Sequence, residues 1–204
     1  MIVTELIPSG KTKVKVFLDY EFAFVLTSKQ IRFYGIEEGH QITDALYAEI
    51  IEDFVLPKAK LKAMDLLKSM DRTEFELRKK LVDAGFSEQI TLEAIEYVKK
   101  FNYVNDYRYA CNYIRYKKDT KSLVMLKMEL KRKGIENDMI SKAVEEEYQA
   151  DMEEDNVRRE VKKKCKSIDD LTYEKKVKIS AYLYRKGYSS SIIRKVLGDL
   201  ELFD

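Results

Sequence analysis

The pattern that most constrains this chain is a Leu, three further residues, a Gly and an apolar residue, and it occurs three times. The copies run from Leu81 to Phe86, from Leu130 to Ile135 and from Leu183 to Tyr188. Glycine enters the left-handed conformation at low cost, and the apolar residue after it packs back on the last helical turn. Each copy therefore predicts the end of a helix.

The three predicted helix ends recur at nearly constant spacing. Gly85 and Gly134 are 49 residues apart (134 − 85), and Gly134 and Gly187 are 53 apart (187 − 134). Apolar residues return at the same offsets after each glycine, at Ile90, Ala94 and Ile95, at Met139, Ala143 and Val144, and at Ile192, Val196 and Leu197. A fixed period built of helices is typical of stacked repeats that share one continuous core. We expect a mainly α fold in which three tandem three-helix repeats form a curved solenoid.

Capping residues and apolar periodicity place three helices in each repeat. The repeats are expected at 58–104, 105–150 and 151–204, with a longer link at 167–170. The expected helices span 58–69, 74–84, 88–101, 105–118, 122–133, 137–149, 151–166, 173–186 and 190–199. Their expected caps are Thr73 with Glu76, Asn105 or Asp106, Ser122, Asn137, Thr172 and Ser189.

Residues 1–57 read differently and predict a small α+β module. Alternation around Val14, Val16 and Leu18, a polar turn at 19–21 and a β-rich return strand at 22–26 indicate a β-hairpin. Ser28 is expected to cap a short helix and Thr43 to open another, and Pro57 suits the first turn of the next helix. We expect residues 58–204 to fold without this module.

Charge separates the module from the repeats. Residues 1–57 carry 5 Lys and Arg against 9 Asp and Glu, whereas the repeats carry 10 against 8, 10 against 8 and 13 against 11. Each repeat is therefore +2, which hints at an anionic partner. No apolar run is long enough for a membrane span, no signal peptide is evident, and two cysteines form no framework. We expect a cytoplasmic protein without a membrane contact.

The residues needed for catalysis are missing from the sequence. There is one histidine, His40, in a Gly-His-Gln turn, so no histidine cluster and no Ser–His or Cys–His pair is available. No phosphate-binding loop motif is present. The acidic runs at 145–147 and 153–155 are expected to be solvated helix faces rather than cation sites. Cys165 is expected to be a small core residue. We expect no enzyme, no cofactor and no metal site.

Basic residues gather on three helical surfaces, and these are the candidate binding sites. Cations along successive helices can line a groove that meets phosphates or acidic protein surfaces; ordinary solvated faces explain them equally well. The first surface holds Arg115, Lys117, Lys118, Lys121, Lys127, Lys131, Arg132 and Lys133. The second holds Arg158, Arg159, Lys162, Lys163 and Lys166. The third holds Lys175, Lys178, Tyr182, Arg185 and Lys186 within an arc of about 100°.

A stripe of tyrosines at Tyr109, Tyr113 and Tyr116 lies on one expected helix. Nucleobases stack on such rings. Helical spacing favours instead rings that are buried, with their hydroxyls in water.

Several motifs resemble the RecX family of regulatory proteins. The opening of the second repeat, with Val104, Asp106, Tyr109 and Ala110, is similar to that family's "leucine-aspartate-aspartate … phenylalanine-alanine" entry, although Asn105 replaces the first acidic residue. Residues 73–78 resemble its "serine-glutamate-x-glutamate-leucine-arginine" helix, and residues 185–189 its C-terminal "arginine-arginine-glycine-phenylalanine-serine" segment. Ile135 replaces a usual aromatic residue. The hairpin module, including residues 18–22, resembles the N-terminal extension of members from Gram-positive bacteria.

The resemblance covers the chain and implies a function. It implies that the protein binds the RecA recombinase filament on single-stranded DNA and contacts the DNA through this filament. It also implies inhibition of strand exchange, ATPase and coprotease activities, which would modulate homologous recombination, DNA repair and the SOS response. We expect a monomer. The alternatives are a helix-turn-helix-like DNA-binding regulator that acts without recombinase and an inert scaffold that shows no DNA-dependent binding.

Overall fold

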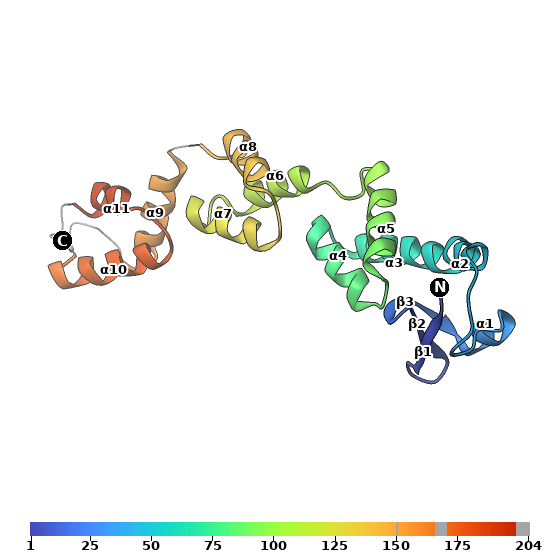
Figure 1. Ribbon diagram of the computed structural model, residues 1–204. Helices are drawn as coiled ribbons and strands as arrows, with labels where there is room; N and C mark the ends of the chain where they lie inside the picture. Colours follow the sequence, from blue (N-terminus) through green and yellow to red (C-terminus); the bar gives the residue numbers. More distant parts are fainter. Residues whose placement is uncertain (150, 166–170, 199–204) are drawn as a thin grey trace. The chain divides into compact units, whose positions relative to one another are not determined.

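The computed structural model describes residues 1–149, 151–165 and 171–198 of the chain (Figure 1). The expected link at 167–170 and Lys166 lie outside these described residues. The chain forms two compact units, which divide between Asn105 and Asp106. The first unit contains the sheet and the first three-helix repeat, and the second unit contains the other two repeats.

The first unit begins with a three-stranded antiparallel sheet in the order β1-β2-β3, formed by Val3–Pro8, Lys13–Leu18 and Glu21–Thr27. β2 and β3 are the predicted hairpin, joined by Asp19 and Tyr20 at φ of 49° and 69°. Two successive left-handed residues make the tight turn that matches the twist of paired strands. The sequence analysis missed β1, in which only Val3 is buried, because a strand with one buried residue lacks clear alternation.

Two short helices follow the sheet, α1 (Ser28–Phe33) and α2 (Asp44–Ile50). Thr43 caps α2 as predicted, through a hydrogen bond from the amide of Leu46. Ser28 is not a cap: Thr27 caps α1 in a reciprocal pair with Gln30. Thr27 ends β3 in an extended conformation, and that conformation is the one that an N-cap residue needs.

Pro57 lies in the first turn of a helix, as predicted, but this helix is continuous with the one before it. α2 runs into a π-helical turn, η1 (Ile51–Val55), and then directly into α3 (Leu56–Ser69), with helical dihedral angles at Ile51, Val55 and Leu56. The amide of Leu56 donates to the carbonyl of Ile51, five residues back. Proline cannot donate the hydrogen bond of a regular helical turn, and a wide turn before it accommodates this loss.

The described residues of the three repeats form the nine predicted helices. The helix predicted to end at 166 ends at Lys162, and every other predicted bound is within two residues of the observed one. After α3, the helices are α4 (Glu74–Asp83), α5 (Glu88–Lys100), α6 (Asp106–Lys117), α7 (Leu123–Arg132), α8 (Asn137–Glu147), α9 (Met152–Lys162), α10 (Tyr173–Arg185) and α11 (Ser190–Leu197).

The repeated glycines end α4, α7 and α10 as predicted. Gly85, Gly134 and Gly187 have φ of 91°, 81° and 85°. In each repeat the amide after the glycine bonds to the carbonyl of the Leu five residues earlier, at 3.2 to 3.3 Å. The glycine amide bonds to the carbonyl three residues earlier, at 2.9 to 3.0 Å. These two bonds define the Schellman motif.

The predicted caps are mostly confirmed. The hydroxyls of Thr73, Ser122 and Ser189 accept hydrogen bonds from amides in the first turns of α4, α7 and α11. Thr172 occupies the cap position of α10 without a side-chain hydrogen bond. Asn137 is not the cap of α8, because Glu136 has the extended conformation of that position and α8 begins at Asn137.

The prediction of one continuous core is wrong for the second unit. The buried residues of the second repeat form one cluster around Ile114, Leu126 and Leu130. Those of the third repeat form a separate cluster around Val161, Leu183 and Tyr188. Each of these repeats therefore buries its own apolar residues, and polar contacts join them.

In the first unit, by contrast, one buried cluster crosses the boundary predicted at Pro57. Val16 and Phe24 of the sheet belong to the same cluster as Ala59, Leu77 and Ile95 of the first repeat. β3 also approaches the end of α4, since a Cβ added at Gly85 would lie 3.6 Å from Val25 Cγ2. The four predicted domains, 1–57, 58–104, 105–150 and 151–204, stay predictions.

Two fragments test how far the shared core ties the first repeat to the sheet. We expect residues 106–204 to show a cooperative helical melt in circular dichroism. We expect the melt of residues 58–204 to show no cooperative transition beyond that of residues 106–204. Without the sheet, the apolar surface of residues 58–105 is exposed to water, so the first repeat does not fold cooperatively. A second cooperative transition in the longer fragment would restore the sequence-based expectation that the repeats fold without the module.

Candidate binding surfaces of the second and third repeats

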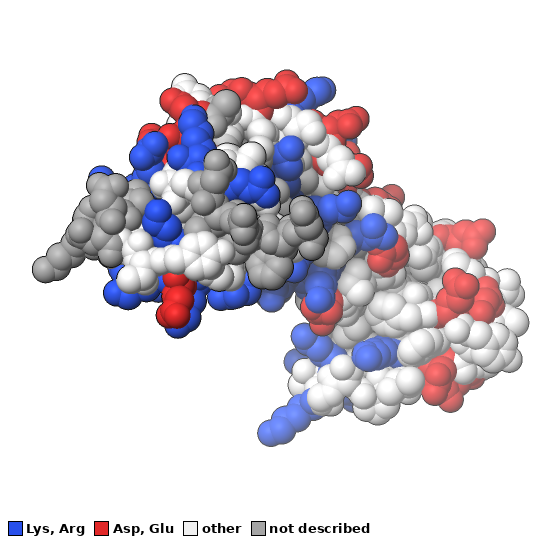
Figure 2. All heavy atoms as spheres, turned by 90° about the vertical axis from the view of Figure 1, so that its left-hand side faces the viewer, with Lys and Arg blue, Asp and Glu red and all other residues white. Residues whose placement is uncertain are grey.

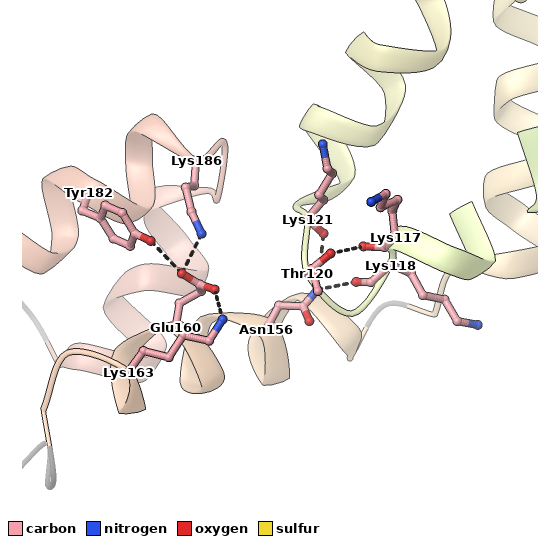
Figure 3. Close-up of polar contacts among 9 residues, drawn as sticks. All are labelled: Lys117, Lys118, Thr120, Lys121, Asn156, Glu160, Lys163, Tyr182 and Lys186. Atoms are coloured by element: carbon pink, nitrogen blue, oxygen red, sulfur yellow. Dashed lines mark hydrogen bonds and ion pairs between the residues drawn. The ribbon is translucent and has the colours of Figure 1, made fainter. Parts of the chain in front are cut away.

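The second and third repeats meet at the loop between α6 and α7. The Asn156 side-chain amide of α9 donates to the carbonyls of Lys118 at 2.6 Å and Lys121 at 3.4 Å (Figure 3). The Ser122 hydroxyl donates to the carbonyl of Lys186 at 2.7 Å, and the amide of Leu123 donates to Glu153 at 3.0 Å. Buried polar side chains thus satisfy backbone groups of the neighbouring repeat, so the junction depends on hydrogen-bond geometry.

Gly187 has a second role at this junction. A Cβ added there would lie 2.8 Å from Ser122 Oγ and 3.3 Å from Met125 Cγ. The helix stop of the third repeat therefore touches the first turn of α7. Glycine is needed for this close approach as well as for its left-handed conformation.

Glu160 on α9 holds three side chains of the third repeat. The residue is only 5% exposed. Its carboxylate accepts from Lys163 Nζ at 2.7 Å, Lys186 Nζ at 2.6 Å and the Tyr182 hydroxyl at 2.8 Å (Figure 3). Burial alone would raise the pKa of Glu160, but these donors outweigh it and hold the pKa at about 2.

Tyr182 and Lys186, predicted as binding residues, are both hydrogen-bonded to Glu160. Lys186 Nζ also lies 5.1 Å from the centroid of the Tyr182 ring, and Lys164 Nζ lies 4.8 Å from it. Lys163 shares the same carboxylate. Arg158 pairs with Glu154 at 2.6 Å, and Arg159 pairs with Asp119 of the second repeat at 3.3 Å. Each of these cations therefore has a partner within the chain.

Most predicted cations near α6 are also engaged within the chain. Arg115 pairs with Glu147, which is buried, and Lys118 Nζ donates to the Glu147 carbonyl at 3.1 Å. Lys121 pairs with Glu129, which also accepts from the Tyr113 hydroxyl at 2.5 Å. Lys117 lies over the Tyr116 ring and Lys133 over the Tyr109 ring, at 4.9 and 5.3 Å from the centroids.

Seven predicted cations remain exposed and form no ion pair with any described residue. Lys162 is the only one of the seven that lies on α9. The α7 row holds Lys127, Lys131 and Arg132, and the α10 row holds Lys175, Lys178 and Arg185. Figure 2 shows that Lys and Arg side chains are spread over several parts of the face at the third-repeat end. These exposed rows are the part of the predicted surfaces that has no ion pair among the described residues.

The α7 row has an apolar component as well. Val124 and Met128 are 53% and 41% exposed and lie one turn apart on α7. Lys127 and Lys131 neighbour them on the helical wheel. These two side chains add a small apolar area beside the exposed cations of the row.

The sequence analysis missed Arg194 and the acidic anchors. Arg194 is exposed on α11, and the α10–α11 turn brings it to the same pocket as Arg185. A helical wheel of one helix could not show this pairing. The acidic runs were taken for solvated faces, yet Glu147 is buried and Glu154 binds both Arg158 and Lys195.

The tyrosine stripe is only partly as predicted. Tyr109 and Tyr113 are half-buried against the core of the second repeat, with ring centroids 6.2 Å apart and nearly parallel rings. Tyr116 is 81% exposed, so its predicted burial is wrong.

One group near α6 has metal-ligating atoms, but its residues are already engaged. The thiol of Cys111 and carboxylate oxygens of Glu146 and Glu147 lie within 4.8 Å of one another. Arg115 pairs with Glu147, and the Tyr107 hydroxyl donates to Glu146 at 2.5 Å. Burial raises the pKa of the Cys111 thiol, which disfavours the thiolate that a metal needs. Cys165 packs against the third-repeat core, as predicted.

Comparison with known proteins matches all three repeats to one family. The first, second and third three-helix domains of RecX match residues 59–97, 105–144 and 152–197. A "Regulatory protein RecX" of Caldanaerobacter subterraneus subsp. tengcongensis is 33% identical over 97% of this chain and 98% of its own length. One of Clostridium acetobutylicum is 31% identical over 93% and 91%.

Solved structures show the same similarity. A crystal structure of a regulatory protein RecX covers 98% of this chain and 100% of its own, with a TM-score of 0.67 and 20% identity. The crystal structure of RecX from Lactobacillus salivarius covers 72% of this chain and 97% of its own, with a TM-score of 0.60 and 25% identity.

The Glu160 contacts predict a pH-dependent stability. Because the folded-state pKa is lowered, the contribution is present above pH about 4.5 and is lost as pH falls toward 2. We expect Glu160→Gln to lower the free energy of unfolding by about 2–3 kcal/mol at pH 7. The difference from the parent should shrink between pH 4.5 and 2. Asp155→Asn, an exposed change on the same helix, is the control for urea melts; a pH-independent difference would contradict this role.

The contact at Gly187 predicts that alanine is worse there than at Gly85. Both glycines are left-handed, so both substitutions carry a similar backbone cost. Only at Gly187 would the new Cβ overlap another residue, and we expect Gly187→Ala to cost about 1–3 kcal/mol more than Gly85→Ala. Chemical denaturation followed at equilibrium measures both. An equal loss of unfolding free energy in the two variants would show that the second and third repeats separate easily at this contact.

Proposed function

The chain belongs to the RecX family of regulatory proteins, and from this premise we propose that it binds the RecA recombinase filament on single-stranded DNA and restrains its activities. The observation that carries the proposal is similarity to RecX regulatory proteins over 97% of the chain, with the three RecX domains in order. Strand exchange, ATP hydrolysis and coprotease function would be inhibited, which would modulate recombination and the SOS response.

The proposed mechanism is binding rather than catalysis. The monomeric protein would lie along the helical groove of the filament, with each repeat contacting a successive protomer. Its presence in the groove would exclude the incoming DNA strand and the repressor-type substrates of coprotease activity. The proposed partner acts on chromosomal DNA, so the proposed location is the bacterial cytoplasm.

The α10 row is the best-supported contact of the third repeat with this partner. Lys175, Lys178 and Arg185 are exposed and form no ion pair with any described residue. Lys175 and Arg185 are ten positions apart on the helix, which separates them by about 15 Å along its axis. Cations spaced along one helix suit an extended anionic surface, whether acidic protein or DNA backbone. The α7 row, with its exposed Val124 and Met128, is the corresponding candidate in the second repeat.

The comparisons do not favour the alternative of a DNA-binding regulator that acts without recombinase, because the relatives are RecX regulators along nearly their whole length. Among the described helices, none is long and apolar enough to cross a membrane.

Reversal of the α10 row tests the proposal. We expect Lys175→Glu, Lys178→Glu and Arg185→Glu together to weaken filament binding by roughly two orders of magnitude. Each exposed contact contributes up to about 1 kcal/mol, and about 1.4 kcal/mol is tenfold. The measurement is inhibition of filament-dependent ATP hydrolysis at two salt concentrations, since added salt should narrow the difference.

A matched variant controls for the change in charge. Lys11→Glu, Lys13→Glu and Lys15→Glu change the net charge equally, at exposed positions of the N-terminal sheet region. This variant should inhibit the filament like the parent. A folded α10 variant that inhibits as strongly as the parent at low salt would identify the row as an ordinary solvated face. Failure of the parent to co-sediment with filaments on single-stranded DNA would refute the function itself.

A further inference from the structure

A pocket lies between α10 and α11 of the third repeat, and Arg185 is its only described lining residue that the proposed function uses. Its volume is about 490 Å³, within the range of pockets that hold small ligands or side chains. Among the described residues, α10 lines it with Ser180, Ala181, Tyr184 and Arg185, and α11 lines it with Ser190, Ile193 and Arg194.

Arg185 and Arg194 give this pocket two cations that come from different helices. Both are exposed, and neither forms an ion pair with any residue in the described ranges. Other basic residues of the third repeat, such as Lys186, Arg158 and Lys195, have carboxylate partners. Guanidinium groups bind carboxylates in a bidentate manner. The pocket therefore offers an anion two donors that the fold itself does not use.

Ser180 adds an unpaired polar group to the same pocket. The residue is 5% exposed. Its hydroxyl forms no hydrogen bond with the part of the chain that the structure describes, whereas Ser122 and Ser189 both use their hydroxyls. A hydroxyl that has no partner within the chain is free to donate a hydrogen bond to a bound ligand or accept one from it.

The lining favours a peptide over a nucleic acid. Ala181 and the buried Ile193 provide aliphatic surface, and the only ring in the described lining belongs to Tyr184, which is 66% exposed. Single-stranded nucleic acids bind through successive stacked bases and a series of phosphate contacts. An aliphatic surface beside two guanidinium groups suits an apolar side chain that has an acidic neighbour.

We propose that this pocket binds an acidic-apolar peptide segment of a partner protein. The apolar side chain would contact Ala181 and Ile193, a neighbouring carboxylate would pair with Arg185 and Arg194, and Ser180 would hydrogen-bond a polar group of the peptide. The inference goes beyond the proposed function, because it assigns a class of ligand to one pocket and does not require the recombinase.

Methyl NMR of the full chain with ¹³C-labelled isoleucine δ1 methyl groups tests the proposal. The probe is the peptide acetyl-Ser-Glu-Leu-Asp-Ser-amide, and its neutral counterpart is acetyl-Ser-Gln-Leu-Asn-Ser-amide. We expect the acidic peptide to shift the Ile193 signal saturably, with a Kd of about 1 mM or tighter, and the neutral peptide to bind about tenfold more weakly. An eight-residue thymidine oligonucleotide should leave the Ile193 signal unchanged.

Variants locate the binding. Arg185→Gln with Arg194→Gln should weaken the acidic peptide at least about tenfold, and Ser180→Ala should weaken it several-fold. Lys11→Gln with Lys13→Gln should bind like the parent. The isoleucine spectrum of each variant without peptide verifies its fold. Three results would overturn the proposal: no Ile193 shift, a shift with the oligonucleotide but not the acidic peptide, or a shift caused by protein concentration alone. Failure here would leave filament inhibition by the α10 row unaffected, because no recombinase is present.

Discussion

The left-handed glycine at the end of the second helix is the constraint on which each repeat depends. It stops the helix in a Schellman motif and turns the chain so that the third helix can pack back on the same core. In all three repeats the preceding Leu is fully buried, and its carbonyl accepts the closing hydrogen bond. One backbone conformation thus links the local sequence signal to the packing of the whole unit.

Polar contacts join the second and third repeats, whose apolar cores are separate. Asn156, Ser122 and Glu153 bind backbone groups across the junction, and Gly187 permits the closest approach. Hydrogen bonds require definite distances and angles, whereas apolar contact tolerates sliding. The junction therefore specifies how the third repeat is attached, and with it the relation between the α7 and α10 rows.

Acidic residues decide which cations are available to a partner. Glu147, Glu154 and Glu160 occupy Arg115, Arg158, Lys163 and Lys186. Of the predicted cations, seven on α7, α9 and α10 are exposed and have no ion pair with a described residue, and Arg194 on α11 adds one more. A surface built in this way binds through few contacts, so its affinity depends strongly on salt and on the match with the partner.

The sequence by itself determined the repeats, their nine helices, the glycine stops and most of the caps, because these depend on interactions within about six residues. The separation of the cores, the shared core of the sheet and first repeat, and the helix through Pro57 were decided by tertiary structure. The sequence also placed Lys175, Lys178 and Arg185 on one face of a helix. Only the fold could show that Glu160 engages Tyr182 and Lys186 and that Arg194 joins Arg185, since these contacts join residues on different helices.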